Sequence, residues 1–427
     1  MLVVGAGLAA AQVVAELRAA GFDGRVRVLG AEGVPPYDHP PLSKHLFDRT
    51  EPAWLSDEIG VDVSALADEV HLARPARELL LGGDRPAVRT DDGVLAADHV
   101  VIATGAHATR PAGWEAALTL HTAADAERLR AALAGGSRRL VVIGAGWIGA
   151  EVAGVAAAAG HEVTVVESAP APLWAALDLA GAFTARWYDE AGVALLTDTQ
   201  VAQVRADGVT LADGRTLEAD VVLAAVGARP ATDWLAGAVP RLPDGSIQVD
   251  PAYRVLAPQA TPPVAAAGRD AETFWVLSGP PGTWWAPVPG LWAVGDAARR
   301  TSPRHGPVRG GHWDGALRGP RALVGHLLGK PVGAPEDDPA PYVFSTQLGH
   351  DLALFGVPQG RDAVLRGDPA GPDGWGVLWY TGDRVAAVLV VDRPRDVGAA
   401  RRLFTGKELP KVDRAVAADP ALPLRPR

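Results

Sequence analysis

A short apolar strand, a glycine turn and an apolar helix follow one another twice along the chain. The two copies span residues 2–17 and 140–159, and a second short apolar strand follows each copy. This arrangement is typical of a βαβ unit, in which the period of two of a strand gives way to the helical period of about 3.6. Two further apolar runs, residues 100–105 and 221–227, end in glycine, which lets a buried strand pass close to a ligand. The pattern therefore predicts an α/β protein with a duplicated βαβ theme.

The C-terminal part of the chain has a different pattern. Residues 250–290 are rich in proline, alanine and tryptophan and show little periodicity, so we expect an inserted loop with little secondary structure of its own. After a proline-rich, acidic link, alternation predicts strands at Gly376–Tyr380 and Val385–Val391, joined by the turn 381–384. A helix is predicted near Asp396–Phe404. These elements indicate a separate C-terminal unit.

Composition narrows the chemistry that the chain can perform. Its 427 residues are enough for two or three hydrophobic cores, so several domains are expected. The net charge is -10 and the 40 basic residues are scattered, so no basic stripe suited to nucleic acid is present. Cysteine is absent, which excludes disulfides, thiolate metal sites and dithiol chemistry. Redox chemistry would therefore need a cofactor, and we expect no metal.

The first residues bear on localisation. Met1 is followed at once by the apolar run Leu2–Val4, which leaves no space for a basic segment and a hydrophobic signal core. No apolar stretch reaches membrane-spanning length. We therefore expect a cytoplasmic protein that does not associate with membranes.

The first glycine turn has the context of a dinucleotide-binding fingerprint. Gly5, Gly7 and Ala10 follow a strand and open a helix. Gly5 permits the tight turn, Gly7 permits close approach of a pyrophosphate, and Ala10 permits close packing of the helix on the strand. Glu32, after the next apolar strand, is the acid expected to bind a ribose. One such motif is a weak signal, because glycine turns also occur for packing alone.

The second copy makes the signal strong. Gly144, Gly146 and Gly149 repeat the spacing, and Glu167 ends the next strand. Two copies, each with a strand, a helix and an acid about 20 residues further on, indicate two dinucleotide sites. Glu167 would repel a 2′-phosphate and no arginine follows it in residues 168–171, so this site is predicted to prefer NADH to NADPH.

Further segments carry a resemblance to a known family. They read PYDHPPLSK at 36–44, ATG at 103–105, WAVGDA at 292–297, HW at 312–313 and DRP at 392–394. With them the chain resembles the FAD-dependent NADH:ferredoxin reductases, a group of ferredoxin, putidaredoxin and rubredoxin reductases that also includes flavoproteins like apoptosis-inducing factor. The resemblance covers nearly the whole chain outside residues 256–289.

The resemblance implies a glutathione-reductase-like α/β fold with two Rossmann-type nucleotide-binding domains and a C-terminal α+β domain. The expected domains are an FAD-binding domain at 1–116 and 239–333 with an insert at about 256–289, an NAD-binding domain at 117–238, and a C-terminal reductase domain at 334–427.

It also implies the cofactors FAD and NADH and the residues that serve them. The residues expected at FAD are Gly5, Gly7, Leu8, Ala9, Ala10, Glu32, Lys44, Thr104, Gly105, His121, Gly295, Asp296 and Trp313. Those expected at NAD are Gly144, Gly146, Trp147, Ile148, Gly149, Glu167, Val226 and Gly227. The expected catalytic residues are Lys44, Glu151 and Trp313.

Each catalytic residue has a physical rationale and a simpler alternative. The resemblance pairs Lys44 with Glu151 near the flavin, and a helix that begins near Trp313 would offer its positive end to a reduced flavin. Read singly, the three residues fit a solvated lysine, a carboxylate favoured by a helix dipole and a packing tryptophan. The surrounding motifs favour the catalytic interpretation.

Two departures from the family pattern lie at His121 and at Gly310-Gly311, and a third places the ribose acid of some relatives at Ala31 instead of Glu32. His121 stands where the family often has an arginine before a Thr-x-x-Asp segment, and Gly310-Gly311 stands where an acidic residue commonly precedes His312. These differences bear on FAD affinity and turnover.

The resemblance and the missing cysteine together predict an activity. NADH delivers two electrons together and an iron-sulfur protein accepts one, so a flavin must stand between them. We expect single electrons to pass to a ferredoxin or rubredoxin, serving an oxygenase such as a cytochrome P-450 or a Rieske system. An NADH oxidase or diaphorase, and an NADH-sensing binding flavoprotein like apoptosis-inducing factor, are the alternatives.

The acceptor is expected to dock on a group of arginines that follows the WAVGDA segment. These are Arg299, Arg300, Arg304 and Arg309. The alternative is that they form ordinary salt bridges. The protein is expected to be a monomer or a homodimer.

Overall fold

The computed structural model describes residues 1–235, 237–259, 284–331, 333 and 337–427, which form two compact units. Unit 1 consists of Met1–Tyr37, Trp54–Ala106 and Arg229–Pro341, and unit 2 of Asp38–Ala53, His107–Ala228 and Tyr342–Arg427. Four short strands straddle the points where the chain passes from one unit to the other, namely β3 (Tyr37–Asp38), β4 (Ala53–Trp54), β10 (Ala106–Ala108) and β18 (Ala228–Pro230).

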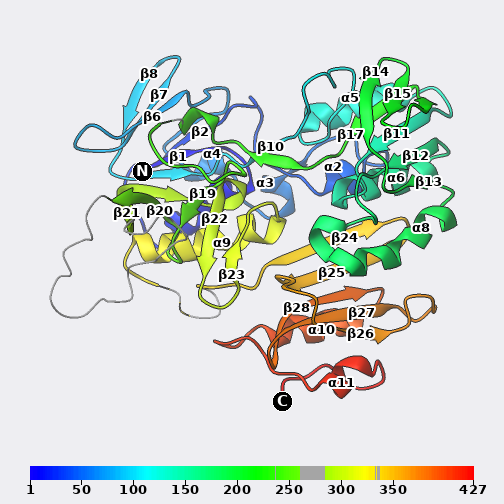
Figure 1. The fold of residues 1–427 in the computed structure, drawn as a ribbon. Helices are drawn as coiled ribbons and strands as arrows, with labels where there is room; N and C mark the ends of the chain where they lie inside the picture. Colours follow the sequence, from blue (N-terminus) through cyan, green and yellow to red (C-terminus); the bar gives the residue numbers. More distant parts are fainter. Residues whose placement is uncertain (236, 260–283, 332, 334–336) are drawn as a thin grey trace. The chain divides into compact units, whose positions relative to one another are not determined.

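A nine-stranded sheet lies at the centre of unit 1 as far as the structure describes it (Figure 1). In spatial order its strands are β23 (Gly306–Val308), β22 (Ala298–Ser302), β19 (Ile247–Val249), β20 (Arg254–Gln259), β21 (Trp284–Ala293), β9 (Val100–Ile102), β1 (Leu2–Val4), β2 (Arg27–Leu29) and β5 (Glu69–His71). The five strands from β21 to β5 run parallel to one another.

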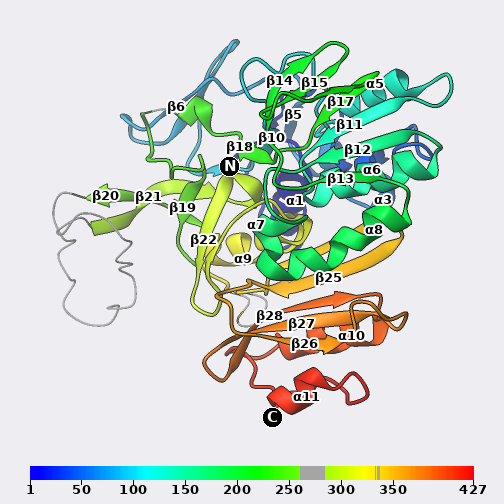
Figure 2. The same cartoon turned by 45° about the vertical axis from the view of Figure 1, so that its right-hand side comes forward.

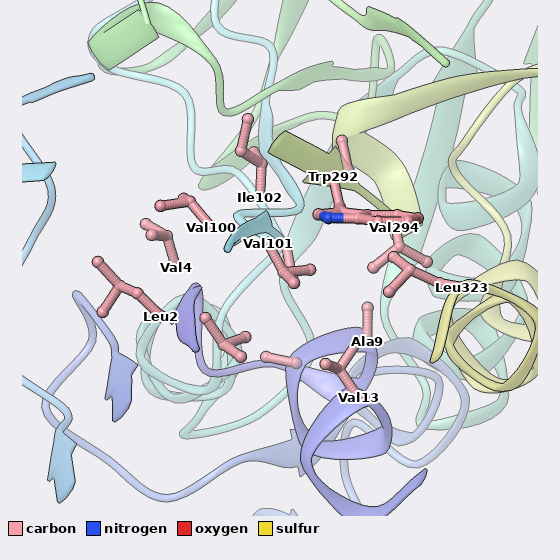
Figure 3. Packing of buried hydrophobic residues seen from close by; sticks show 14 of the residues in the cluster. Leu2, Val4, Ala9, Val13, Val100, Val101, Ile102, Trp292, Val294 and Leu323 are labelled. Carbon is pink, nitrogen blue, oxygen red and sulfur yellow. The ribbon is translucent and has the colours of Figure 1, made fainter. Parts of the chain in front are cut away.

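The central parallel strands β1 and β9 are buried in the sheet. Every residue of β1 and β9 is buried, which explains their unbroken apolar sequences. Helix α1 (Leu8–Ala19) packs against α9 (Trp313–Leu327), and both contribute to one apolar cluster with the strands. Figure 3 shows Ala9 and Val13 of α1, Leu323 of α9 and Trp292 of β21 within this cluster.

Smaller elements complete unit 1. They are the helices α3 (Leu55–Glu58) and α4 (Val63–Leu66), the 3-10 turns η2 (Asp233–Leu235) and η4 (Gly295–Ala297), and a three-stranded antiparallel sheet of β6 (Glu78–Leu80), β7 (Ala87–Thr90) and β8 (Gly93–Ala96).

The expectation of an insert with little secondary structure is wrong at both of its ends. Strands β20 and β21 form an antiparallel pair, and their last partners are Gln259 and Trp284. β-branched and aromatic residues around the prolines favour strands, and the sheet supplies the hydrogen-bonding partner that a one-dimensional pattern does not reveal. The rest of the predicted insert, residues 260–283, lies outside the described residues.

Unit 2 is built on a four-stranded parallel sheet. Its order is β13 (Ala194–Leu196), β12 (Glu162–Val166), β11 (Arg139–Ile143) and β17 (Val221–Ala224). The accompanying helices are α2 (Pro41–Lys44), α5 (Ala123–Leu133), α6 (Trp147–Ala158), α7 (Trp174–Leu177), η1 (Asp178–Thr184) and α8 (Ala185–Glu190). A three-stranded antiparallel sheet contains β14 (Val201–Arg205), β15 (Gly208–Leu211) and β16 (Thr216–Glu218).

The C-terminal part of unit 2 is a five-stranded antiparallel sheet. Its order is β24 (Tyr342–Gln347), β25 (His350–Gly356), β28 (Arg384–Val391), β27 (Trp375–Thr381) and β26 (Ala363–Gly367). Helix α10 (Pro394–Leu403) contacts β25 and β28, and α11 (Arg414–Ala418) contacts β26 (Figure 2). The predicted hairpin and the helix after it are confirmed, as are both strand-turn-helix copies. None of the described helices is long and apolar enough to cross a membrane.

Candidate active site

The first fingerprint has the backbone geometry that a pyrophosphate cradle needs. Gly5 has φ +116°, and a Cβ built on it would lie 2.1 Å from the carbonyl oxygen of Ala103, so a side chain there is excluded. Apart from its chain neighbours, no described residue has an atom within 4 Å of a Cβ built on Gly7, the N-cap of α1. Leu8, Ala9 and Ala10 are buried in the first turn of α1. The open space beside a helix N-terminus fits the phosphates of FAD.

Glu32 is exposed but held by a neighbour. The buried Tyr37 hydroxyl donates to Glu32 Oε2 at 2.8 Å. Tyr37 also packs edge-on against Trp54, with 6.1 Å between ring centroids. Because Glu32 follows the C-terminal end of β2, its position suits a ribose hydroxyl.

Thr104 and Gly105 extend the same edge of the sheet beyond β9. Gly105 has φ +66°, and its carbonyl oxygen accepts the N–H of Ala231 at 2.9 Å. The Thr104 hydroxyl donates to the carbonyl oxygen of Ala231 at 2.8 Å. Thr104 is therefore already bonded to the protein, and its backbone is the part suited to a cofactor.

The loop around Asp296 explains one departure from the family pattern. Asp296 Oδ1 accepts the N–H of Gly311 at 2.7 Å. A Cβ on Gly310 would lie 2.4 Å from the Cα of Asp296, and Gly311 has φ +99°. The two glycines therefore allow backbone to pack on backbone where Gly295 (φ +73°) and Asp296 form η4.

Trp313 is the first residue of α9, as predicted. The first N–H groups of this 15-residue helix have no intrahelical acceptor, so its N-terminus has a positive electrostatic potential. Burial lowers the pKa of the preceding residue, His312, although the charge of Asp296 opposes this effect. A lowered pKa favours the neutral form of His312.

In unit 2, a buried carboxylate gathers three donors. Glu151, on the first turn and a half of α6, accepts from Lys44 Nζ and from the Ser345 hydroxyl at Oε1, and from the Ser43 hydroxyl at Oε2 at 2.5 Å. Glu151 is 4% exposed. The ammonium of Lys44 also lies 5.3 Å from the centre of the Phe344 ring. The structure thus brings the predicted pair Lys44 and Glu151 together as an ion pair.

Two members of this cluster were missed by sequence reasoning. Ser43 lies inside the motif that contains Lys44, so its neighbour could have suggested it. Ser345 is 194 positions from Glu151 in the sequence, and no local pattern links them. Its role depends on how β24 packs against α6.

His121 packs against another histidine. The rings of His39 and His121 meet edge to face, with 5.4 Å between centroids. Burial, and then the charge of His121, lower the pKa of His39 to about 4. The backbone N–H of His121 donates to Asp125, whose carboxylate also closes the capping box at the start of α5. The expected contact of His121 with FAD stays a prediction.

The second fingerprint repeats the geometry of the first in unit 2. A Cβ on Gly144 would lie 2.5 Å from the carbonyl oxygen of Ala225, and one on Gly149 would lie 2.0 Å from that of Gly144. Apart from its chain neighbours, no described residue has an atom within 4 Å of a Cβ on Gly146. Trp147 and the exposed Ile148 begin α6. Val226 is exposed, and Gly227 has φ +99° beyond β17.

Glu167 is fixed by backbone donors. Its Oε2 accepts the N–H of Ala145 within the fingerprint loop, and its Oε1 accepts the N–H of Ala169, each at 2.7 Å. The carboxylate therefore stands at the C-terminal end of β12, beside the loop that would cradle the nucleotide. A negative charge held there suits ribose hydroxyls and disfavours a phosphate.

The docking role expected for two of the four arginines is wrong. The side chains of Arg300 and Arg304 are 6% and 5% exposed and both pair with Asp338. They are buried because β22 and the turn after it pack on the segment around Asp338, a contact between distant residues. Arg299 is a quarter exposed, and Arg309 is 71% exposed, with its Nε 4.0 Å from Asp244.

The fold and these motifs define a class: a flavoprotein oxidoreductase that uses a pyridine nucleotide. Residues 1–268 match the pyridine nucleotide-disulphide oxidoreductase family, and residues 342–427 match the reductase C-terminal family. The chain belongs to this oxidoreductase family and carries the reductase C-terminal domain. Its cofactors are FAD and NADH.

Named relatives cover the whole chain. It is 33% identical over 440 residues to the anthranilate 1,2-dioxygenase system ferredoxin--NAD(+) reductase component of Burkholderia cepacia, covering 99% of this chain and 98% of that protein. It is 31% identical to putidaredoxin reductase CamA of Pseudomonas putida, covering 100% and 96%. The crystal structure of the covalent putidaredoxin reductase–putidaredoxin complex matches with a TM-score of 0.80 at 29% identity, covering 97% and 96%.

Proposed function

We propose that this protein takes hydride from NADH and passes single electrons to a ferredoxin-type iron-sulfur protein that serves an oxygenase. The observation that carries the proposal is the absence of cysteine from a member of a family named for disulphide chemistry. Without a dithiol, electrons that reach the cofactor must leave to an external acceptor. The names of the relatives, which are reductase components paired with ferredoxins, support an iron-sulfur acceptor.

The residues of both fingerprints fit their dinucleotides. For FAD we assign the cradle to Gly5, Gly7 and the first turn of α1, the ribose to Glu32, and the ribityl chain to Asp296. For NADH we assign the cradle to Gly144, Gly146 and Gly149, and the ribose to Glu167. Bound FAD supplies the conversion from two-electron to one-electron transfer.

The chain's own catalytic contribution is electrostatic. We assign to Lys44 the placement of a positive charge at the flavin, with Glu151 as the counter-ion that holds it. The N-terminal end of α9 at Trp313 adds positive potential, which stabilises negative charge on a reduced cofactor. No protein nucleophile takes part.

The test compares acceptors directly. The purified FAD-bound protein is reduced anaerobically with NADH and then mixed in a stopped-flow instrument with a [2Fe-2S] ferredoxin, a rubredoxin or oxygenated buffer. Reoxidation of the flavin should be faster with an iron-sulfur protein than with oxygen. Faster reaction with oxygen would identify an oxidase or diaphorase. Slow reaction with every acceptor would identify an NADH-sensing flavoprotein.

A further inference from the structure

The two oxygens of the Glu151 carboxylate accept different numbers of hydrogen bonds. Its Oε1 carries two donors, the ammonium of Lys44 and the hydroxyl of Ser345, while its Oε2 carries Ser43. Burial removes the hydration of this carboxylate, and the three donors replace the lost hydrogen bonds with water. Ser43 and Lys44 are neighbours on α2, whereas Ser345 belongs to β24 of the C-terminal domain.

Ser345 is itself oriented by a second C-terminal residue. The side-chain amide of Gln347 donates to Ser345 Oγ at 2.9 Å. A hydroxyl has one hydrogen, and since Ser345 Oγ accepts from Gln347, that hydrogen is left to point at Glu151. Ser345 and Gln347 are two residues apart on β24, so they lie on the same face of the strand. They are 3% and 1% exposed.

We propose that Ser345, held by Gln347, is a positioning residue that the C-terminal domain contributes to the Lys44–Glu151 pair. The Ser345 hydroxyl and the Lys44 ammonium both donate to Oε1 of Glu151. The hydroxyl points the positive end of its O–H dipole at the carboxylate. It thereby fixes the carboxylate in one orientation and offsets part of its charge. This inference rests on that part of the proposed function in which the Lys44–Glu151 pair acts on the flavin.

The proposal has two consequences. Without the Ser345 hydroxyl, the Glu151 carboxylate is no longer held in one orientation, and neither is the Lys44 ammonium that it binds. Hydride transfer from NADH therefore slows. The carboxylate charge is also less compensated, which disfavours additional negative charge on a nearby flavin. The midpoint potential of the flavin should therefore become more negative.

The experiment uses the FAD-bound full chain with Ser345→Ala, Gln347→Met and the double variant. In Ser345→Ala, the rate constant for flavin reduction at saturating NADH should fall about tenfold, while the Kd for NADH stays unchanged. The midpoint potential should shift to a more negative value. Gln347→Met should change both quantities in the same direction by less. In the double variant, Gln347→Met should add nothing to the effect of Ser345→Ala, because Gln347 acts through Ser345.

Two further variants separate positioning from strand stability. Thr346→Ala removes an exposed hydroxyl of the same strand, which donates to Asp351 at 2.8 Å, and should leave the rate and the potential as in the wild type. Ser345→Thr keeps the hydroxyl and should restore most of the rate. A lower melting temperature of Ser345→Ala with unchanged potential and rate overturns the proposal, and so does full additivity in the double variant.

The result is distinguishable from the test of the acceptor. Flavin reduction and midpoint potential are measured without ferredoxin, so they report on Ser345 whichever acceptor the protein uses. If the Ser345→Ala effects appear while no iron-sulfur protein is reduced, the positioning role stands and the proposed acceptor fails. If ferredoxin is reduced and Ser345→Ala behaves as the wild type, the proposed acceptor stands and the positioning role fails.

Discussion

At the scale of the residue, Glu167 shows how hydrogen bonds from the backbone fix the position of a charged side chain. The N–H groups of Ala145 and Ala169 each bond one of its oxygens, so its charge is fixed beside the fingerprint loop. A fixed charge discriminates more strongly than a mobile one, because it cannot turn away from a phosphate.

We therefore predict that Glu167→Arg narrows the preference for NADH over NADPH. The ratio of the two rates of flavin reduction should change by at least about tenfold, because repulsion of the 2′-phosphate is replaced by attraction. Stopped-flow reduction with each nucleotide measures it. Glu162→Arg, at the exposed start of the same strand, is the matched control and should keep the ratio. An unchanged ratio in Glu167→Arg would show that this acid does not read the ribose.

A second residue should make stability depend on pH. Burial, and then the charge of Arg304, lower the pKa of His305 from its ordinary value of 6.5 to about 4. Between these values the unfolded chain binds a proton that the folded protein does not. The free energy of unfolding should therefore fall as the pH drops from 6.5 to 4, by up to about 3 kcal/mol from this residue.

His305→Gln should flatten this pH dependence, since glutamine does not titrate. Denaturant unfolding of the FAD-bound protein at a series of pH values measures the effect, and His45→Gln, at a half-exposed histidine, serves as control. The interpretation is wrong if the two variants have parallel stability curves.

At the scale of the element, β20 and β21 form an antiparallel pair within the sheet of unit 1. The two strands remain paired as far as Gln259 and Trp284, whose Cα atoms are partners in the ladder. A short turn can close an antiparallel pair at such a position. Beyond this pair, β21 also pairs with β9 in the parallel part of the sheet.

We predict that replacing residues 260–283 by an Asn-Gly turn leaves FAD content and NADH-driven dye reduction largely intact. Bound flavin is measured by its absorbance, and dye reduction by steady-state rates. A deletion of the same kind that also removes β20 is the control and should lose stability, because β20 pairs with both β19 and β21. Loss of FAD from the first variant would assign the replaced residues to the cofactor site.

At the scale of the whole molecule, the exposure of arginines decides which of them can dock the electron acceptor. Arg309 is 71% exposed, whereas Arg300 and Arg304 are internal. Small electron carriers bind through small, transient and charged interfaces, in which a charge at the rim changes the association rate more than the chemistry.

We predict that Arg309→Glu slows ferredoxin reduction about tenfold at low salt and leaves flavin reduction by NADH unchanged. The difference from the wild type should shrink as salt rises, because salt screens exposed charges. Arg425→Glu, an exposed arginine near the C-terminus, is the control. Equal rates for the two variants would place the acceptor elsewhere.

Much of the fold was predictable because its determinants are local. Gly5 and Gly144 have positive φ and backbone neighbours within 2.5 Å of a Cβ, so a side chain cannot replace them and the glycine motif can be recognised in the sequence. The apolar runs of β1, β9, β11 and β17 are recognisable because both faces of a parallel strand are buried. The turn at 381–384 follows from its own residues.

The sequence by itself thus determined the two dinucleotide folds, the positions of their acidic residues and the absence of thiol chemistry, since each depends on residue type and short spacing. Apart from the predicted Lys44–Glu151 pair, tertiary structure alone decided which distant residues meet. It joined Ser345 to Glu151, buried Arg300 and Arg304 on Asp338, and paired β20 with β21. Such contacts link residues that are distant in the chain, and their free energy comes from burial and mutual orientation, which a linear pattern does not contain.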